Sequence, residues 1–357
     1  MNEEKVSEIL IKLSSIAGVS GAENAATEIA ARYFRQYTEK VKKDRFGNLL
    51  ALFPGEASST REKLTLAVVA HIDEIGLMVT RVEKGGFLRF IPIGSIDPRI
   101  LPGQAVEIHG KNRFKGVIGA SPPHLLSPKE QKETVPVDKL FIDPGLNEET
   151  VKNQIGIGDY VTFEQTPLKL QAGNKITGKA LDNRTSVAAL IICAEELNNL
   201  RHQADICFVS SLQEEVGLRG AVTDAYGLKP DLALVVDVTH GDAPGLDDRS
   251  VFKVGGGPAL AIGPNLHPGL CRKLEEIAKE RLLPYQREPI PGHSGTDAWA
   301  FQISREGIPT ALLSIPLLNM HTPVEIISLD DLMILGKMLG YFAASIDSTF
   351  LEELKKC

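Results

Sequence analysis

Residues 206–217 read ICFVSSLQEEVG, an apolar run that ends in two adjacent carboxylates and a glycine. The run 206–212 is typical of a buried strand, and Glu214 and Glu215 follow its end. Like charges at the end of a buried strand repel each other unless a cation or a shared proton compensates them. The pair is therefore either a solvated loop feature, the commoner case for a lone acidic pair, or part of a metal site.

Strands and helices alternate in the first and last parts of the chain. Near-continuous apolar runs predict strands covered on both faces at 64–71, 206–212, 232–238 and 310–315. Apolar residues at helical spacing predict helices at 4–17, 186–200, 267–282 and 296–306 and after Ser328. This alternation predicts an α/β fold with a mostly parallel central sheet sandwiched by helices.

A capping signature precedes the second predicted helix. Ser20 is followed three residues later by Glu23, which is the spacing of a capping box. We therefore expect Ser20 to cap a helix that continues to about Tyr37.

The middle of the chain, from Gly76 to Gly178, lacks long helical patterns. Glycine and proline separate short strand-like runs at 87–93, 104–109, 114–118, 140–142, 160–163 and 168–171. Short strands at such intervals are typical of a small β-barrel or sandwich. We therefore predict an inserted, barrel-like all-β domain at 76–171, within a discontinuous domain formed by 1–75 and 172–357.

The composition argues against several functional classes. The 357 residues are 43% hydrophobic and 24% charged, and the net charge of −7 is unlike that of a general nucleic-acid binder. No apolar run is long enough to cross a bilayer, and the first residues lack the pattern of a signal peptide.

The four cysteines show no CxxC spacing; they are Cys193, Cys207, Cys271 and Cys357. We therefore expect reduced thiols in a cytoplasmic protein, rather than disulfides or a thiolate metal site. If a metal is bound, its ligands should be His, Asp and Glu side chains.

Potential metal ligands lie at the ends of the predicted strands. They are His71 with Asp73, Glu214 with Glu215, Asp237, and His321 shortly after 310–315. In an open α/β sheet, ligands bind in the crevice at the carboxyl ends of the strands. Asp182, just before a predicted helix, adds a further group. A single strand end with a His, Asp or Glu can easily occur by chance, but four such strand ends in one chain are much less expected. The set therefore predicts a metal site.

Each of these residues also has an ordinary structural explanation. His71 could be a hydrogen-bonded core histidine, Asp182 a helix cap and His321 a loop residue. Residues two apart in an extended chain share a side, so Asp73 can accept a hydrogen bond from the second ring N–H of His71 and fix its tautomer. Asp237 lies inside an apolar strand, where a carboxylate requires a partner or a cation.

Five motifs occur in order along the chain: HIDEIG at 71–76, ALDNR at 180–184, QEEVGLRGA at 213–221, VVDVT at 235–239 and MHTPVE at 320–325. Together they resemble the dinuclear metallo-aminopeptidases of the TET or glutamyl-aminopeptidase type, and more loosely the wider clan of co-catalytic zinc exopeptidases. The resemblance covers nearly the whole chain, including the β insertion.

The resemblance implies two divalent metal ions per subunit, bridged by Asp182. His71 and Asp237 would complete one site, and Glu215 and His321 the other. Oxygen and imidazole ligands suit zinc, which we expect first, and also cobalt or manganese.

The same resemblance implies the activity, a metal-dependent aminopeptidase that removes N-terminal residues from peptides in the cytoplasm. Glu214 would remain off the metals as the general base for a metal-bridging water, with Asp73 behind His71. Its partners would be peptide substrates, without nucleic acid or membrane.

The resemblance further implies that the β insertion mediates dimerisation and that dimers can build a tetrahedral twelve-subunit shell. The segments 255–258 and 293–298 resemble stretches that line the substrate pocket. Whether His293 contacts substrate, or His124 a neighbouring subunit, stays open. The remaining histidines are expected to be surface or structural residues: His109, His202, His240 and His267.

Three alternatives compete with the aminopeptidase. A deacylase or carboxypeptidase could use the same metal site and would differ in the end of the substrate that it recognises. A glycosidase needs two carboxylates and no metal. A metal-binding scaffold without catalysis would not need Glu214 as a base. The sequence leaves the preferred N-terminal residue, the metal and the oligomer size open.

Overall fold

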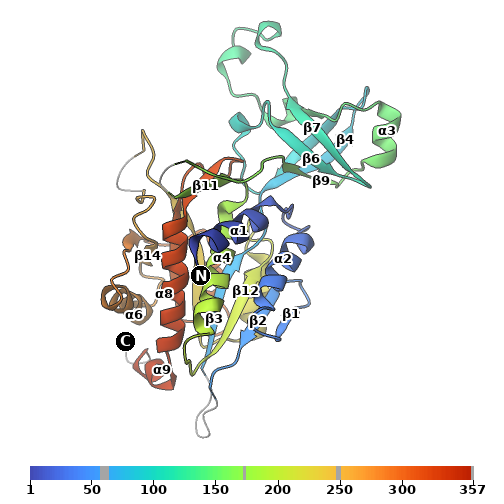
Figure 1. Ribbon diagram of the computed structural model, residues 1–357. Helices are drawn as coiled ribbons and strands as arrows, with labels where there is room; N and C mark the ends of the chain where they lie inside the picture. The colour runs from blue at the N-terminus through green and yellow to red at the C-terminus, as the bar shows by residue number, and fades with distance from the viewer. Residues whose placement is uncertain (57–63, 172–173, 247–250, 355–357) are drawn as a thin grey trace.

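The computed structural model describes residues 1–56, 64–171, 174–246 and 251–354. It consists of an α/β part built on an eight-stranded sheet and a closed six-stranded β-barrel (Figure 1). This arrangement confirms the predicted fold class.

The large sheet places its parallel strands at the centre. Its strands follow the order β1 (Val41–Lys43), β2 (Leu49–Phe53), β12 (Asp205–Ser211), β3 (Thr65–His71), β13 (Leu232–His240), β16 (Thr310–Leu317), β14 (Ala259–Ile262) and β15 (Gln286–Pro289). The central strands β12, β3, β13 and β16 are mutually parallel, with Ser211 beside His71 and Asp237 beside Ser314. Their carboxyl ends therefore lie at one edge of the sheet, which faces the barrel in Figure 1.

Helices cover both faces of this sheet because its strands are apolar on both sides. In β3, Leu66 and Val68 face one hydrophobic layer, whereas Ala67 and Val69 face the other. The first layer is formed by α1 (Glu3–Ser15), α2 (Asn24–Phe34), α4 (Leu181–Leu197) and α8 (Leu329–Ser345). The second layer is formed by α5 (Arg219–Leu228) and α7 (Ala298–Gln302). Helix α6 (Pro268–Glu280) packs beside α8, and the short helix α9 (Ser348–Leu354) follows α8 in the chain.

The capping box predicted at Ser20 is wrong. Helix α2 begins at Asn24, and Glu23 at its N-cap makes no side-chain capping bond. The Ser20 hydroxyl instead donates to Asp73 Oδ2 at 2.6 Å. Because α2 begins only at Asn24, Ser20 lies outside the cap position, and its hydroxyl forms a charge-assisted hydrogen bond with the buried carboxylate instead.

The barrel contains the strands β4 (Gly76–Val82), β5 (Leu88–Ile93), β8 (Phe141–Asp143), β7 (Arg113–Gly119), β6 (Ala105–His109) and β9 (Tyr160–Phe163) in that spatial order. Side chains such as Val79, Phe90 and Ile108 fill its core. A short helix, α3 (Glu148–Gln154), was not predicted and packs against the barrel.

The predicted strand near 168 forms outside the barrel. Strand β10 (Leu168–Lys169) pairs with β11 (Lys175–Gly178), which pairs with β17 (Glu325–Ser328). This small sheet connects the end of the barrel segment to the last strand of the chain. The domain division at residues 75/76 and 171/172 stays a prediction.

Three of the four cysteines can be placed. Cys193, Cys207 and Cys271 are free and buried, while Cys357 lies outside the described residues. Among the described helices, none has the length and apolar character that a bilayer-crossing segment requires.

A buried ionic network joins the helix α1 region to β3 and α4. Arg184 is fully buried, and its Nη2 lies 3.2 Å from Glu74 Oε1. Lys179 Nζ lies 2.7 Å from Glu74 Oε2. Arg184 also donates to the carbonyl oxygens of Leu13 and Ile72 at 2.7 and 3.1 Å. Because Glu74 adjoins Asp73 in sequence, the network fixes the backbone immediately behind the sheet edge.

We expect Glu74→Ala to lower the free energy of unfolding by about 3–5 kcal/mol, because two buried cations would lose their shared carboxylate. Urea unfolding followed by circular dichroism measures this change. Glu133→Ala is the control, since Glu133 forms only an exposed ion pair with Lys129. Equal losses in the two variants would contradict a stabilising role for the network.

Candidate metal centre

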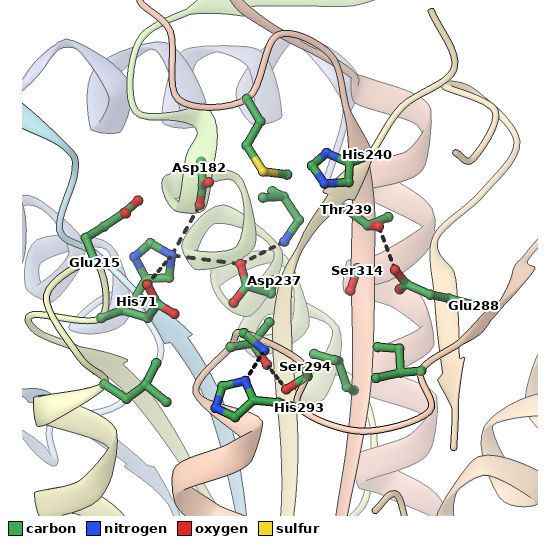
Figure 2. Close-up of a pocket in the computed structure, with 18 of the residues that line it drawn as sticks. His71, Asp182, Glu215, Asp237, Thr239, His240, Glu288, His293, Ser294 and Ser314 are labelled. Atoms are coloured by element: carbon green, nitrogen blue, oxygen red, sulfur yellow. Dashed lines mark hydrogen bonds and ion pairs between the residues drawn. The ribbon is translucent and has the colours of Figure 1, made fainter. Parts of the chain in front are cut away.

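The structure brings all seven predicted site residues to the carboxyl edge of the sheet, and Figure 2 shows four of them: His71, Asp182, Glu215 and Asp237. His71 and Asp73 lie at and just after the end of β3, and Glu214 and Glu215 lie in the loop after β12. Asp237 lies on β13, Asp182 at the start of α4, and His321 in the loop between β16 and β17. All except Asp73 line one cavity of about 570 Å³.

Two possible metal-binding groups share Asp182. Its Oδ1 lies 3.2 Å from His71 Nε2, and its Oδ2 lies 3.3 Å from His321 Nε2. Asp237 Oδ1 is 3.8 Å from His71 Nε2, and Glu215 Oε1 is 3.5 Å from His321 Nε2. Within each group the ligand atoms lie within 4.8 Å of one another. Each group thus offers one imidazole and two carboxylates, with one carboxylate in common.

Glu214 lies close to the same atoms. Its Oε2 is 4.0 Å from His71 Nε2, and His71, Glu214 and Glu215 form a third group within the same 4.8 Å limit. Distance alone therefore leaves Glu214 able to act as a ligand or as a base.

Asp73 holds two of the strand ends together. Its Oδ1 lies 3.4 Å from His71 Nδ1 and accepts the Glu214 backbone N–H at 3.0 Å, while Oδ2 accepts the Glu215 N–H at 3.2 Å. Burial acts to raise the pKa of Asp73, but hydrogen bonding to His71 and its charge lower it. The carboxylate orients the His71 ring so that Nε2 faces the cavity, and it also positions the acidic loop.

The barrel orients His321. The Nδ1–H of this ring donates to the carbonyl oxygen of Ser95 at 2.7 Å, which leaves Nε2 facing Asp182. Ser95 lies just after β5, so the segment that forms the barrel contributes to the site. His321 has a φ of 59°, in the left-handed region that residues other than glycine seldom adopt.

Sequence reasoning missed the role of Glu325. Its Oε2 accepts the backbone N–H groups of Leu181 and Asp182 at 2.7 and 3.1 Å, and its Oε1 accepts that of His321 at 3.0 Å. Glu325 is buried at the start of β17. Its position in an apolar strand was the available signal, the same argument that singled out Asp237.

The acidic groups of the site crowd one another. Burial, followed by the charges of Asp237, Asp297 and Glu215, raises the pKa of Glu214 to about 10. Burial and the charge of Asp182 raise the pKa of Glu215 to about 7. A positive charge in the cavity would relieve this repulsion, and oxygen and imidazole donors suit zinc, cobalt or manganese. The residues present therefore fit a divalent-cation site.

Two further histidines line the cavity. The ring of His293 contacts that of Trp299 in a tilted arrangement with centroids 4.4 Å apart, and its Nδ1 accepts the Gly295 N–H at 2.9 Å. His240, expected to be a surface or structural residue, is exposed and reaches the cavity wall. His124 lies in an exposed short turn of the barrel segment, away from the cavity-lining residues.

Without metal, the protein should lose stability as the pH rises from about 5 to 9. The raised pKa values of Glu214 and Glu215 mean that the folded state retains protons that the unfolded state releases above the ordinary glutamate value of 4.5. Burial opposes protonation of His321, but Asp182 and Glu215 raise its pKa from 6.5 to about 9, so its stabilising proton is lost over the same range.

Thermal unfolding of chelator-treated and metal-loaded protein at several pH values tests this expectation. The metal-loaded protein should show a higher unfolding temperature and a weaker pH dependence, because bound cations replace the protons. An unfolding temperature of the metal-free protein that rises with pH would contradict the crowding of carboxylates.

Known proteins resemble this chain in sequence and in fold. A sequence model for the family described as M42 glutamyl aminopeptidase matches residues 47–338. A lysyl aminopeptidase from Pyrococcus furiosus is 36% identical over 324 residues, which cover 89% of this chain and 91% of the relative.

Two solved structures resemble the whole chain. An aminopeptidase from the archaeon Desulfurococcus kamchatkensis has a TM-score of 0.91 at 33% identity, with 99% of this chain and 98% of the other covered. The TET1 peptidase of Pyrococcus horikoshii, described as able to assemble into a tetrahedron or a large octahedral shell, has a TM-score of 0.82 at 32% identity, with 96% and 100% covered.

Proposed function

This chain belongs to the M42 glutamyl aminopeptidase family and is a metal-dependent aminopeptidase, and we propose how its site performs the reaction. The observation that carries the proposal is the position of Asp182, whose two carboxylate oxygens each face a different histidine. A single carboxylate placed in this way can bridge two cations.

We propose that two divalent ions bind per subunit, with Asp182 as the bridge. His71 and Asp237 complete one site, and Glu215 and His321 complete the other. Zinc is the first candidate, and cobalt and manganese suit the same donors. Asp73 supports the ring of His71 across a distance of 3.4 Å, and Glu325 supports the backbone of Asp182 and His321 through hydrogen bonds.

Two such cations, when bound, would polarise the scissile carbonyl and lower the pKa of the attacking water. Glu214 acts as the general base: it takes a proton from that water and returns it to the leaving amine. Its backbone N–H is fixed by Asp73, and its side chain lines the cavity beside His71. Asp73 keeps the His71 imidazole and the Glu214–Glu215 loop in fixed positions relative to each other during this transfer.

We propose that the segment 76–171 is a dimerisation domain inserted into a catalytic domain formed by 1–75 and 172–357. Large apolar side chains are exposed on this segment: Ile91, Val117, Leu125 and Ile157. Pairing of such surfaces would build dimers, and dimers could build a tetrahedral dodecamer, as the shell described for the TET1 relative suggests. The buried free thiols fit a cytoplasmic location.

The substrate end is the first property to test. After chelation and re-metallation with zinc or cobalt, the protein should hydrolyse aminoacyl chromogenic substrates with a free amino group. It should not release C-terminal residues or cleave N-acetylated analogues, and chelator should abolish the activity. Release of C-terminal residues would instead indicate a carboxypeptidase, cleavage of N-acylated amino acids alone a deacylase, and chelator-resistant cleavage of a glycan a glycosidase.

Glu214→Gln should keep two metal ions per chain but lower kcat by about 10²- to 10⁴-fold, because the general base is lost while the proposed ligands remain. Elemental analysis and steady-state kinetics measure the two quantities. Asp182→Ala is the matched comparison and should lose metal from both positions. Retained activity in the first variant, or two retained ions in the second, would contradict the assigned roles.

A further inference from the structure

One carboxylate in the cavity has no part in the proposed chemistry. Glu288 lies on β15, and its Oε1 accepts the Thr239 hydroxyl at 2.6 Å. Its Oε2 is buried and has no hydrogen-bond partner among the described residues. Figure 2 shows the side chain pointing to Thr239 and Ser314, on the side of the cavity away from His71 and Asp182.

The charge of Glu288 is not compensated by a basic side chain of the cavity. Of the described residues that line the cavity, none is a lysine or an arginine. The neighbouring Arg287 pairs with Glu275 at 2.6 Å, on the opposite side of the strand, because successive side chains alternate. A carboxylate with one buried, unpartnered oxygen is costly, and a cation supplied by a ligand would offset that cost.

The histidines of the cavity do not provide that cation. His293 accepts a backbone N–H at Nδ1, and it forms no ion pair with Glu288 among the described residues. His240 lines the cavity but forms no ion pair with Glu288 in the described structure. The cavity is therefore lined by the carboxylate of Glu288 without a positively charged side chain paired to it among the described residues.

The distance from the metal centre identifies the part of the substrate that would meet Glu288. Asp237 and Thr239 are two residues apart on β13, which separates them by about 6.6 Å along the strand. The α-amino group lies next to the scissile carbonyl and so stays near the metal ligands. The side chain of the first residue branches from the carbon beside that carbonyl, so it can extend over this distance toward Glu288.

The walls of the cavity also offer apolar surface to an aliphatic stem. Ile290, Leu312 and Met320 line it with apolar surface. Lysine and arginine bury such stems along apolar surface while their charged ends bind polar partners. We infer that Glu288 selects peptides whose N-terminal residue has a positively charged side chain, with lysine as the best fit. This inference rests on the proposed aminopeptidase function and adds its substrate class.

Steady-state kinetics with lysyl and norleucyl 4-nitroanilides test the inference, because norleucine offers a similar stem without the ammonium group. The wild-type enzyme should favour the lysyl substrate in kcat/KM, and a glutamyl substrate should be the poorest. In Glu288→Gln the ratio of lysyl to norleucyl kcat/KM should fall by about 10- to 100-fold. Glu288→Asp, which keeps the charge, should retain part of the preference.

Glu275→Gln is the matched control, because it removes a carboxylate near the same strand but outside the cavity lining. The lysyl-to-norleucyl ratio should not change in this variant. A wild-type preference for norleucyl or glutamyl substrates, or an unchanged ratio in Glu288→Gln, would overturn the inference but leave the aminopeptidase function intact. If the re-metallated wild type cleaved none of these substrates, the proposed function itself would fail.

A binding measurement separates recognition from turnover. In a Glu214→Gln background, isothermal titration calorimetry should show tighter binding of lysyl-leucine than of norleucyl-leucine. Adding Glu288→Gln should remove that difference. Persistence of the difference in the double variant would overturn the assignment of Glu288.

Discussion

Carboxylates packed at the edge of a buried sheet must be matched by positive charge, and this requirement governs the structure around the cavity. Four lie together in the proposed metal centre, where burial and mutual repulsion raise the pKa of Glu214 and Glu215. Behind the edge, Glu74 is instead matched from within the chain by Lys179 and Arg184. Protein cations thus match the carboxylate in the core, and the proposed divalent ions would match those in the cavity.

The ligands keep their positions because two further carboxylates bind backbone N–H groups. Asp73 connects the end of β3 to the loop after β12, and Glu325 connects the start of α4 to the loop that carries His321. Each connection joins segments that are distant in sequence. Removing one of these carboxylates would therefore displace more than one ligand.

The sequence could predict the sheet and the convergence of the candidate ligand residues because both follow local rules. Apolar runs mark parallel strands, and ligand-type residues at their carboxyl ends must converge. Contacts such as Ser20 to Asp73 and Glu325 to the backbone of Asp182 could not be predicted, because they join residues far apart in the chain. Strand β15 was missed for another reason: its sequence QREP is short and polar, without an apolar pattern.

The hydrogen bond from His321 to the Ser95 carbonyl makes the barrel segment part of the proposed metal centre. A rotation of the barrel against the sheet would turn the His321 ring away from Asp182. The free energy of ion binding at that position therefore contains a contribution from the barrel orientation, and by linkage ion binding restrains that orientation in return. Self-association through the barrel would then change the affinity of the proposed Glu215–His321 site for its ion, and ion binding there would change self-association to the same degree.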